Sequence, residues 1–271
     1  EDHPSVRGTG PLTLHEGRLY VPITGISEAM SGANAEYECC TFRGSLTALN
    51  AATGEEIWKT YTIPEPQRRG TSSAGKPLWG PAGVGIWNAP TIDVEHGRIY
   101  SGTGPAYAGP APATTDSVIA FDLQTGAIEW VNRFTLDVWL LQCDGGAQAN
   151  PNCPEENGPD IDFSASPILT TDSAGKDVIV IPQKSGMAYA LDPDNGGKTL
   201  WTYRAGPGGP VGGVWGSAVE DDRMYVAVGG YGNEETGGIH AIDIDTGERI
   251  WYTPPQPPLC SPPRTGCSRR S

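Results

Sequence analysis

Short apolar runs alternate with turn-forming residues along the whole chain, and one pattern of them repeats. The pattern is A-x-[DN]-x-x-x-G-x-x-x-W, and its four copies begin at Ala48, Ala120, Ala190 and Ala241, the third being one residue longer. In each copy an apolar strand end runs into an Asn or Asp and then a T-G or N-G pair. Glycine supplies a positive φ and the Asx side chain caps the turn, so the pattern predicts a tight hairpin.

The Trp of each copy then begins the returning strand, where its large ring can cover the neighbouring repeat. A second hairpin precedes each copy, as in Gly17-Arg18-Leu19-Tyr20 and Gly97-Arg98-Ile99-Tyr100. Each unit therefore holds about four strands, which is the content of one β-propeller blade. Two separate antiparallel sandwiches would explain the number of strands, but they would not explain four copies of one docking Trp.

We therefore predict an all-β chain in which residues 1–271 form a single propeller domain or part of one. The expected blades span about residues 8–60, 86–132, 162–203 and 213–253, and residues 254–271 form a tail or inter-blade loop rich in Pro and Cys. The composition agrees, because 37 Gly, 25 Pro and only 18% charged residues favour many short strands over long helices.

The net charge of -14 disfavours nucleic acid as a partner, because binding to phosphates depends on Lys and Arg. The negative charge is compatible with a basic redox partner. No apolar stretch approaches the ~20 residues that span a bilayer, so we expect a soluble chain without a membrane span. The chain has neither an initiating Met nor a signal peptide, which is typical of a mature or excised segment.

The six cysteines form three local pairs, which are Cys39 with Cys40, Cys143 with Cys153, and Cys260 with Cys267. Fifteen pairings are possible, and closure within short loops is the simplest of them. Such disulfides indicate an oxidising compartment, hence a periplasmic or secreted location. The alternatives are that the adjacent Cys39 and Cys40 pair elsewhere or stay reduced. A zinc site is disfavoured because CxxC and a suitable His pair are missing, and without CxxCH the chain carries no c-type haem.

The eleven-residue pattern resembles the tryptophan-docking signature of the quinoprotein alcohol dehydrogenases from about Gly8 to Tyr252. Three further stretches, E-C-C-T-F-R-G-S, G-P-D-x-D-F-x-A-S-P and Q-K-S-G, look most like the polyvinyl alcohol dehydrogenases of that family. The resemblance implies that these four blades belong to a larger ring of seven or eight, with a closed four-bladed ring as the alternative. It also implies oxidation of a secondary or polymeric alcohol with pyrroloquinoline quinone (PQQ) and Ca²⁺, with electrons passed to a cytochrome c.

The resemblance also implies residues for the cofactor site. Trp87 occupies the position at which family members place a residue against one face of the PQQ ring, as its floor, and a planar quinone needs an aromatic face. A vicinal disulfide of Cys39 and Cys40 would cap the quinone, although in the family this cap sits one blade earlier. Arg43 follows it in the same loop, and Trp215 occupies a position like that of Trp87 in another blade. An ordinary core role is the alternative for Trp87.

For the chemistry, Asp162 precedes an aromatic residue as the family's proton acceptor does, and Asp160 is the reserve. Lys184 lies where the family places a cation against the quinone oxygens. Glu38 is the nearest carboxylate for calcium, which prefers several hard oxygen ligands. The alternatives are an ordinary loop end for Asp162 and a surface position for Lys184.

Two departures from the family count against activity. Pro105 stands where the family has an Asn ligand of calcium, and it offers only a main-chain carbonyl. An apolar residue in Asp137-Val138-Trp139-Leu140 stands where related enzymes have the base. The alternative functions are therefore a non-catalytic binding or scaffold propeller, or an inactive fragment of the enzyme.

Overall fold

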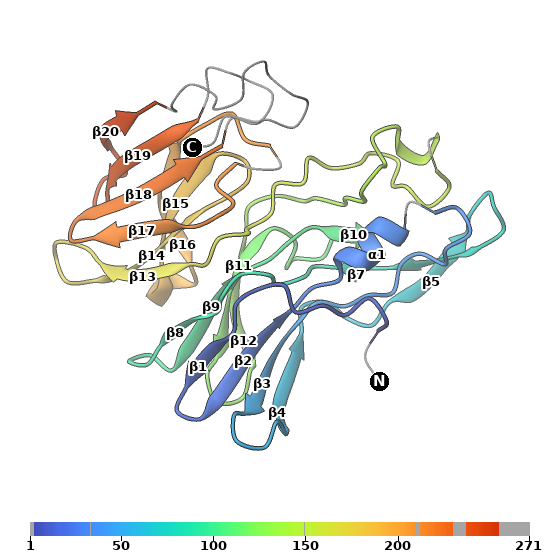
Figure 1. Ribbon diagram of the computed structural model, residues 1–271, viewed down its shortest axis with the longest axis horizontal. Coiled ribbons are helices and arrows are strands. Elements are labelled where there is room, and N and C mark those ends of the chain that lie inside the picture. Colours follow the sequence, from blue (N-terminus) through green and yellow to red (C-terminus); the bar gives the residue numbers. More distant parts are fainter. Residues whose placement is uncertain (1–2, 33, 149, 210–211, 230–236, 255–271) are drawn as a thin grey trace, which may run out of the picture. The chain divides into compact units, whose positions relative to one another are not determined.

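The computed structural model describes residues 3–32, 34–148, 150–209, 212–229 and 237–254. The chain divides into two compact units, residues 1–160 and 161–271. Each unit contains two four-stranded antiparallel sheets, and unit 1 adds a pair of two-stranded sheets (Figure 1). The all-β class and the four-stranded sheets predicted from the repeat are confirmed.

In unit 1 the strands of each large sheet lie side by side in chain order. The first sheet contains β1 (Thr13–His15), β2 (Arg18–Ile23), β3 (Ser45–Asn50) and β4 (Glu56–Tyr61), and the second contains β8 (Thr91–Asp93), β9 (Arg98–Gly102), β11 (Ser117–Asp122) and β12 (Ile128–Arg133). Unit 2 repeats this order with β13 (Ile168–Thr171), β14 (Asp177–Pro182), β15 (Met187–Asp192) and β16 (Lys198–Arg204), then β17 (Ser217–Glu220), β18 (Arg223–Val228), β19 (Gly238–Asp243) and β20 (Arg249–Thr253). The four sheets thus span residues 13–61, 91–133, 168–204 and 217–253, and the blade boundaries stay a prediction.

The repeat places the same three positions in one row across each sheet. In the first sheet Tyr20 on β2 is opposite Ala48 on β3, which is opposite Trp58 on β4. The small Ala leaves room for the two rings to meet, with their centroids 6.0 Å apart. The second and fourth sheets have the corresponding Tyr–Trp contacts.

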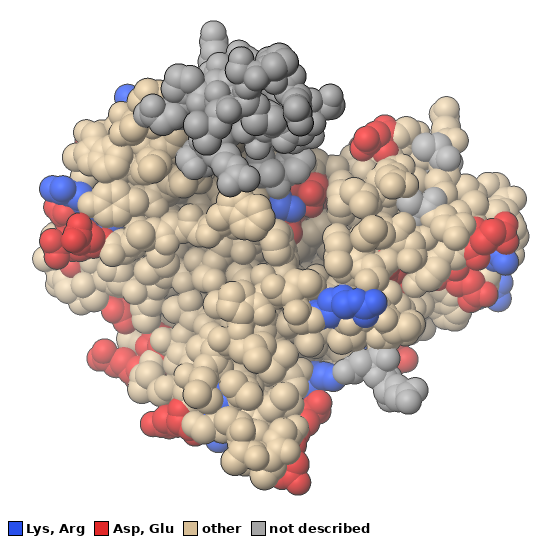
Figure 2. All heavy atoms as spheres, viewed as in Figure 1, with Lys and Arg blue, Asp and Glu red and all other residues tan. Residues whose placement is uncertain are grey.

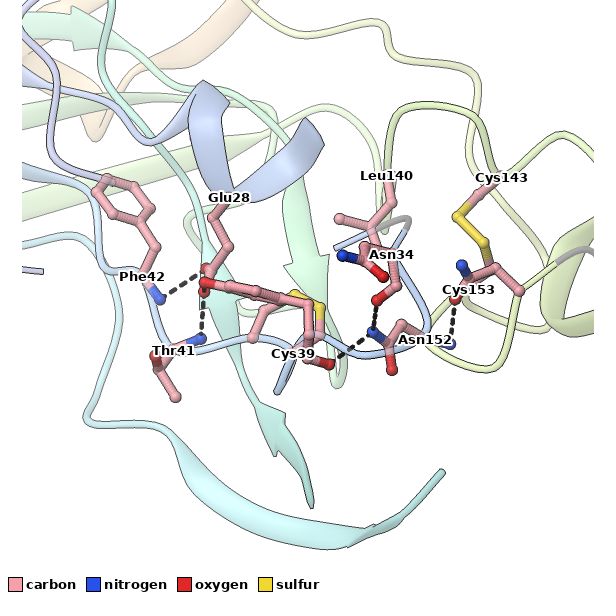
Figure 3. The surroundings of a disulfide bond; sticks show 12 residues. Glu28, Asn34, Cys39, Thr41, Phe42, Leu140, Cys143, Asn152 and Cys153 are labelled. Atoms are coloured by element: carbon pink, nitrogen blue, oxygen red, sulfur yellow. Dashed lines mark hydrogen bonds between the residues drawn. A yellow bond between two sulfur atoms is a disulfide. The ribbon is translucent and has the colours of Figure 1, made fainter. Parts of the chain in front are cut away.

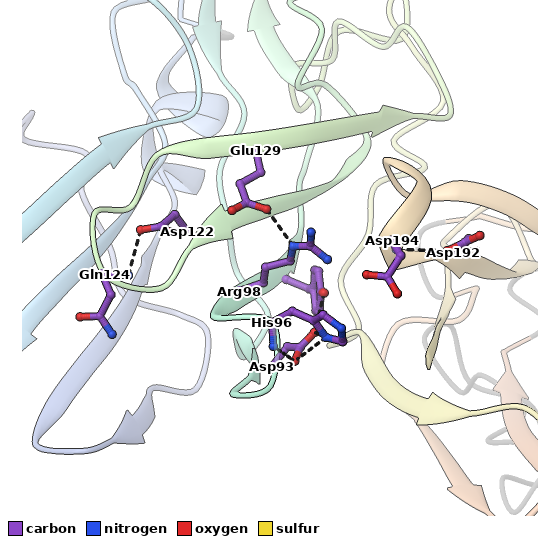
Figure 4. A network of polar contacts seen from close by, with 9 residues as sticks. Asp93, His96, Arg98, Asp122, Gln124, Glu129, Asp192 and Asp194 are labelled. Atoms are coloured by element: carbon purple, nitrogen blue, oxygen red, sulfur yellow. Dashed lines mark hydrogen bonds and ion pairs between the residues drawn. The ribbon is translucent and has the colours of Figure 1, made fainter. Parts of the chain in front are cut away.

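Each Asx residue caps its turn as the pattern predicted. Asp122 accepts hydrogen bonds from the main-chain N–H groups of Gln124 (3.1 Å) and Thr125 (2.7 Å). The Thr125 bonds lower the pKa of Asp122. Figure 4 shows this turn together with the β8–β9 hairpin, where buried Asp93 accepts a hydrogen bond from the main-chain N–H of His96 at 3.0 Å and Arg98 pairs with Glu129 at 2.8 Å.

Within each unit, the Trp of one sheet docks on the turn glycine of the next. Trp58 lies against Gly126, where an added Cβ would come within 2.6 Å of the indole Cδ2, and Trp201 lies against Gly247 in the same way, with 2.7 Å to Cδ2. Apolar side chains of both sheets complete each junction, for example Ile99 and Phe121 in unit 1 and Met224 and Ile242 in unit 2. The predicted docking role of these two Trp residues is therefore observed.

Unit 1 carries a layer of loops that the repeat did not predict. This layer contains α1 (Ile26–Ser31), the pair β5 (Gln67–Thr71) and β6 (Pro77–Gly80), the pair β7 (Ala82–Gly83) and β10 (Ala106–Ala108), and the 3-10 turn η1 (Gly146–Gln148). In the described part of unit 2, the addition to the two sheets is the 3-10 turn η2 (Pro193–Asn195), where the sequence predicted a turn. Most of the residues that the sequence proposed for unit 1 lie in this loop layer.

Candidate functional site

The loop between α1 and β3 carries the vicinal disulfide. Cys39 is bonded to Cys40, and both side chains are buried, with 2% and 0% of their surface exposed. The loop is tied to β6, because the Cys39 carbonyl accepts a hydrogen bond from the Trp79 N–H at 2.8 Å. The disulfide thus lies buried inside unit 1 rather than on its surface.

A buried carboxylate that the sequence reasoning missed anchors this loop. Glu28 on α1 is fully buried and accepts hydrogen bonds from the main-chain N–H groups of Thr41 (2.9 Å) and Phe42 (2.7 Å), directly after the disulfide (Figure 3). The Tyr37 hydroxyl donates to it as well, and the pKa of Tyr37 is raised, first by burial and then by the Glu28 charge. Glu38, the carboxylate expected for calcium, is exposed.

A signal for Glu28 was present in the sequence. It is the only charged residue between Arg18 and Glu36, in a stretch that is otherwise apolar or small. A charge in such surroundings is buried only when it is paired or bonded. The sequence reasoning passed over it because no repeat or motif contains it.

The second disulfide closes the loop that follows β12. Cys143 is bonded to Cys153, and both pack in the same apolar cluster as Cys39 and Cys40. Asn152, beside Cys153, donates its side-chain amide to two main-chain carbonyls of the α1–β3 loop. The two disulfide loops therefore support each other. The predicted pair Cys260 and Cys267 lies outside the described residues.

Arg43 lines a cavity of 360 Å³ in unit 1. Its guanidinium carbon lies 3.7 Å from the centre of the Tyr61 ring, and Nη2 donates to the Ile63 carbonyl at 2.9 Å. Trp79, His3 and Glu65 also line the cavity. The cavity thus offers one cation beside two aromatic rings.

Trp87 is half-buried and stands just before β8. The next residue, Asn88, is buried, and its side chain donates to the Gly102 carbonyl at 2.8 Å and accepts from the Gly102 N–H at 3.2 Å. The carbonyl of Pro105, the group left where the family has an Asn, accepts a hydrogen bond from the Val84 N–H at 2.9 Å. It is therefore already engaged in holding the loop.

In unit 2, the two residues predicted for proton transfer and charge stabilisation form one buried ion pair. Lys184 Nζ lies 2.6 Å from Asp162 Oδ1, and the two residues are 7% and 3% exposed. The Lys184 N–H also donates to the Asp162 carbonyl at 3.2 Å. A surface position for Lys184 is excluded. Trp215, proposed to line the channel, is 88% exposed in unit 2.

A polar group flanks this ion pair along the chain. The buried Gln183 accepts from the hydroxyls of Ser185 (2.6 Å) and Tyr189 (3.0 Å), and burial raises the pKa of Tyr189. Phe163 lies against the Tyr189 ring, with centroids 5.9 Å apart. Asp160, the reserve base, belongs to unit 1, where its N–H donates to Asp137 at 3.0 Å.

The surface agrees with the acidic composition. Figure 2 shows Asp and Glu side chains scattered over the visible face and no continuous field of Lys and Arg on it. Among the described residues, none of the helices has the length and apolar character needed to cross a membrane.

Two family models match the chain. Residues 22–151 match the model described as "Glucose/ethanol/alcohol dehydrogenase, beta-propeller domain", and residues 184–266 match the one described as "Outer membrane protein assembly factor BamB". The polyvinylalcohol dehydrogenase of a Pseudomonas species is 41% identical over 98% of this chain, and that of Sphingopyxis sp. (strain 113P3) is 38% identical over 93% of it. The chain spans only 41% and 39% of the length of these two relatives.

Solved structures of low identity share the fold. A europium-containing methanol dehydrogenase aligns with a TM-score of 0.61 and 16% identity, covering 91% of this chain and 54% of the other. The quinohemoprotein alcohol dehydrogenase ADHIIG of Pseudomonas putida HK5 aligns with a TM-score of 0.56 and 15% identity, covering 92% and 52%. These likenesses agree with the predicted propeller blades.

Proposed function

Because this chain belongs to the PQQ-dependent alcohol dehydrogenase family, we propose that it binds PQQ and oxidises an alcohol. A secondary alcohol, including a polymeric one such as polyvinyl alcohol, is the proposed substrate. The observation that carries the proposal is the buried Asp162–Lys184 pair, which brings together the two groups assigned to the chemistry. The 41% identity to a polyvinylalcohol dehydrogenase supports the choice of substrate.

The described residues include groups that suit PQQ. The 360 Å³ cavity combines the Arg43 guanidinium with the rings of Tyr61 and Trp79, and a planar molecule that bears carboxylates needs a cation and aromatic faces. PQQ, when bound, supplies the acceptor for the hydride of the alcohol. Arg43 would hold a carboxylate. The Cys39–Cys40 disulfide and Trp87, the predicted cap and floor, are not among the residues that line this cavity.

The proposed role of Asp162 is to accept the proton of the alcohol hydroxyl at a carboxylate oxygen. Lys184 orients that carboxylate through its 2.6 Å contact and supplies positive charge in a buried setting, where charge acts strongly. Calcium is the second proposed cofactor, with exposed Glu38 as its carboxylate ligand. The two oxygens of Glu28 already accept hydrogen bonds from the loop, so Glu28 is assigned to holding the loop.

We further propose a periplasmic or secreted location, which suits the two disulfides. A cytochrome c is the proposed electron acceptor, and the chain's net charge of -14 suits a basic partner.

The test is titration of this chain with PQQ and Ca²⁺. Because a ligand that binds only the folded state must stabilise it, we expect a rise in Tm and reduction of a dye when a secondary alcohol is added. Arg43→Ala should abolish the Tm rise with PQQ, whereas Arg68→Ala, on exposed β5, should leave it unchanged. If neither PQQ nor Ca²⁺ changes the Tm, the proposal is contradicted and a scaffold propeller is favoured. The match of residues 184–266 supports this second candidate.

A sharper variant is Asp162→Asn. It keeps the size of the side chain but removes the proposed proton acceptor, so dye reduction should fall by about 10²-fold or more while PQQ still raises the Tm. Asp194→Asn, on the exposed η2 turn, is the matched control and should keep full activity. Equal activity of the two variants would remove Asp162 from the mechanism.

A further inference from the structure

A short segment at the start of the described chain contributes one side of the 360 Å³ cavity. Two of its residues, His3 and Val6, line the cavity. Val6 also packs against the apolar cluster that contains both disulfides, and the main chain of Arg7 exchanges hydrogen bonds with that of Thr24 at 2.8 and 3.0 Å. We call residues 3–7 the strap, because this segment is attached at Arg7 and reaches the cavity at His3.

The ring of His3 is held in one orientation. Its Nδ1 accepts a hydrogen bond from the Ser5 N–H at 3.1 Å, so the proton of the neutral ring lies on Nε2. Nε2 lies 3.0 Å from Thr41 Oγ1 and 3.4 Å from Glu28 Oε1, and both oxygens can accept from it. The ring also lies at 76° to the ring of Phe42, with their centroids 5.9 Å apart. The side chain of His3 thus joins the strap to α1 and to the loop that follows it.

Glu28 connects the strap to the residues that position Arg43. Its carboxylate is fully buried and accepts hydrogen bonds from the N–H groups of Thr41 and Phe42, the two residues before Arg43 (Figure 3). A buried carboxylate is stable only where donors surround it. Because His3 Nε2 lies beside the same Oε1 that accepts from Thr41, the strap and the Arg43 loop share one anchor.

From this shared anchor we infer that His3 is a positioning residue and that the strap controls access to the 360 Å³ cavity. While His3 contacts Glu28 and Thr41, the strap stays against the cavity and restricts entry to the Arg43 guanidinium. When these contacts are broken, the strap stays attached at Arg7, but its His3 end no longer covers the cavity.

The inference deepens the proposed function, and the use of the strap rests on that function, since the strap would set the rate at which PQQ enters and leaves. Access to the cavity is nevertheless a property of the chain alone. It is therefore measured without PQQ or calcium, and a failure of the cofactor proposal leaves the measurement intact.

The experiment follows the reaction of Arg43 with p-hydroxyphenylglyoxal, a neutral aromatic dicarbonyl that condenses with guanidinium groups. Mass spectrometry of the folded chain gives the rate at each arginine. Arg68, on exposed β5, reports the activity of the reagent in the same sample. Arg18, on β2, has a buried Nη1 and reports any general loosening of unit 1.

Three variants test the role of His3. His3→Ala removes the contacts of the ring, so we expect the rate at Arg43 to rise by about 10-fold, as for the loss of one hydrogen bond, with the rates at Arg68 and Arg18 unchanged. His3→Gln restores an N–H donor and should return most of the protection. His15→Ala is the matched control, because its side chain is 24% exposed and His15 is not among the residues that line the cavity, and it should leave the rate at Arg43 unchanged.

Two outcomes would overturn the inference. If the rate at Arg43 is the same in His3→Ala as in the unaltered chain, the strap does not restrict access to the cavity. If the rate at Arg18 rises as much as that at Arg43, His3 stabilises unit 1 as a whole and has no particular effect on the strap.

Discussion

Within the described residues the same Trp–Gly junction occurs in each unit, and the two copies differ in the hydrogen bonding of the indole nitrogen. In unit 2, Trp201 is 9% exposed and its Nε1 donates to the Ile244 carbonyl at 2.6 Å. In unit 1, Trp58 is half-buried, and its Nε1 has no acceptor among the described residues. Instead, Thr60 Oγ1 donates to the carbonyl of the turn glycine, Gly126, at 2.7 Å.

The comparison separates two parts of the repeated motif. The shape of the contact, a ring against a glycine, is common to both junctions and follows from the repeated residues. The hydrogen bonding varies with the residue two positions after the Trp, which is Thr60 in unit 1 and Tyr203 in unit 2. The Tyr203 hydroxyl is instead hydrogen-bonded to His240 Nδ1, at 2.8 Å. The contact between the ring and the glycine is therefore shared by the two junctions, whereas the polar contacts differ between them.

Removing the ring should have the largest effect. Trp201→Ala deletes a nearly buried indole and leaves a cavity against Met224 and Ile242, so we expect unit 2 to lose about 3–5 kcal/mol of unfolding free energy. Trp58→Ala should cost less, about 2–3 kcal/mol, because part of that ring is already exposed. Hydrogen exchange of the strand amides in each unit measures the two losses separately. Equal losses would show that exposure does not decide the difference.

The turn glycines test the contact from its other side. Gly126 and Gly247 have φ of +72° and +73°, and Gly54 has +75°, but only at Gly54 would an added Cβ meet nothing within 4 Å. Gly54→Ala is thus a matched control that carries the backbone cost alone, about 1 kcal/mol. Gly247→Ala and Gly126→Ala should each cost about 2–3 kcal/mol, because the Cβ also displaces the indole. If all three cost the same, the glycines serve the turn and not the docking.

The indole N–H distinguishes the two junctions directly. Trp201→Phe leaves the Ile244 carbonyl without its donor, so it should cost about 1 kcal/mol more than Trp58→Phe, in which no hydrogen bond is lost. Urea unfolding followed by hydrogen exchange in each unit gives both values. A larger cost at Trp58 would mean that its N–H bonds to something outside the described residues.

The repeat made the four sheets predictable, but it could not reveal the loop layer of unit 1, which holds most of the residues proposed for that unit. Alternation and turn residues specify strands locally, so the rows Tyr20–Ala48–Trp58 and their counterparts follow from the pattern. Glu28 and Asn152 depend instead on loops that meet through contacts distant in sequence, such as Asn152 with Asn34. The pairing of Asp162 with Lys184 was equally hidden, although both residues were identified singly. The roles of Glu38, Trp87 and Trp215 stay predictions.

The smallest expected effect concerns the pH dependence of unit 2. The pKa of His240 is lowered from its ordinary value, first by burial and then by the positive charge of Arg249. Below pH ~6.5 the His240 imidazole takes up a proton in the unfolded chain, whereas in the folded chain it does so only at a lower pH. The stability of unit 2 should therefore decline as the pH falls from ~6.5 to the lowered pKa of the folded state, and should lose no more through this group below it. His240→Gln removes the titration and should flatten this part of the profile, while the strand amides around Trp58 in unit 1 serve as the internal reference. A decline of equal size in both units, or one that persists in His240→Gln, would assign the pH dependence to other groups.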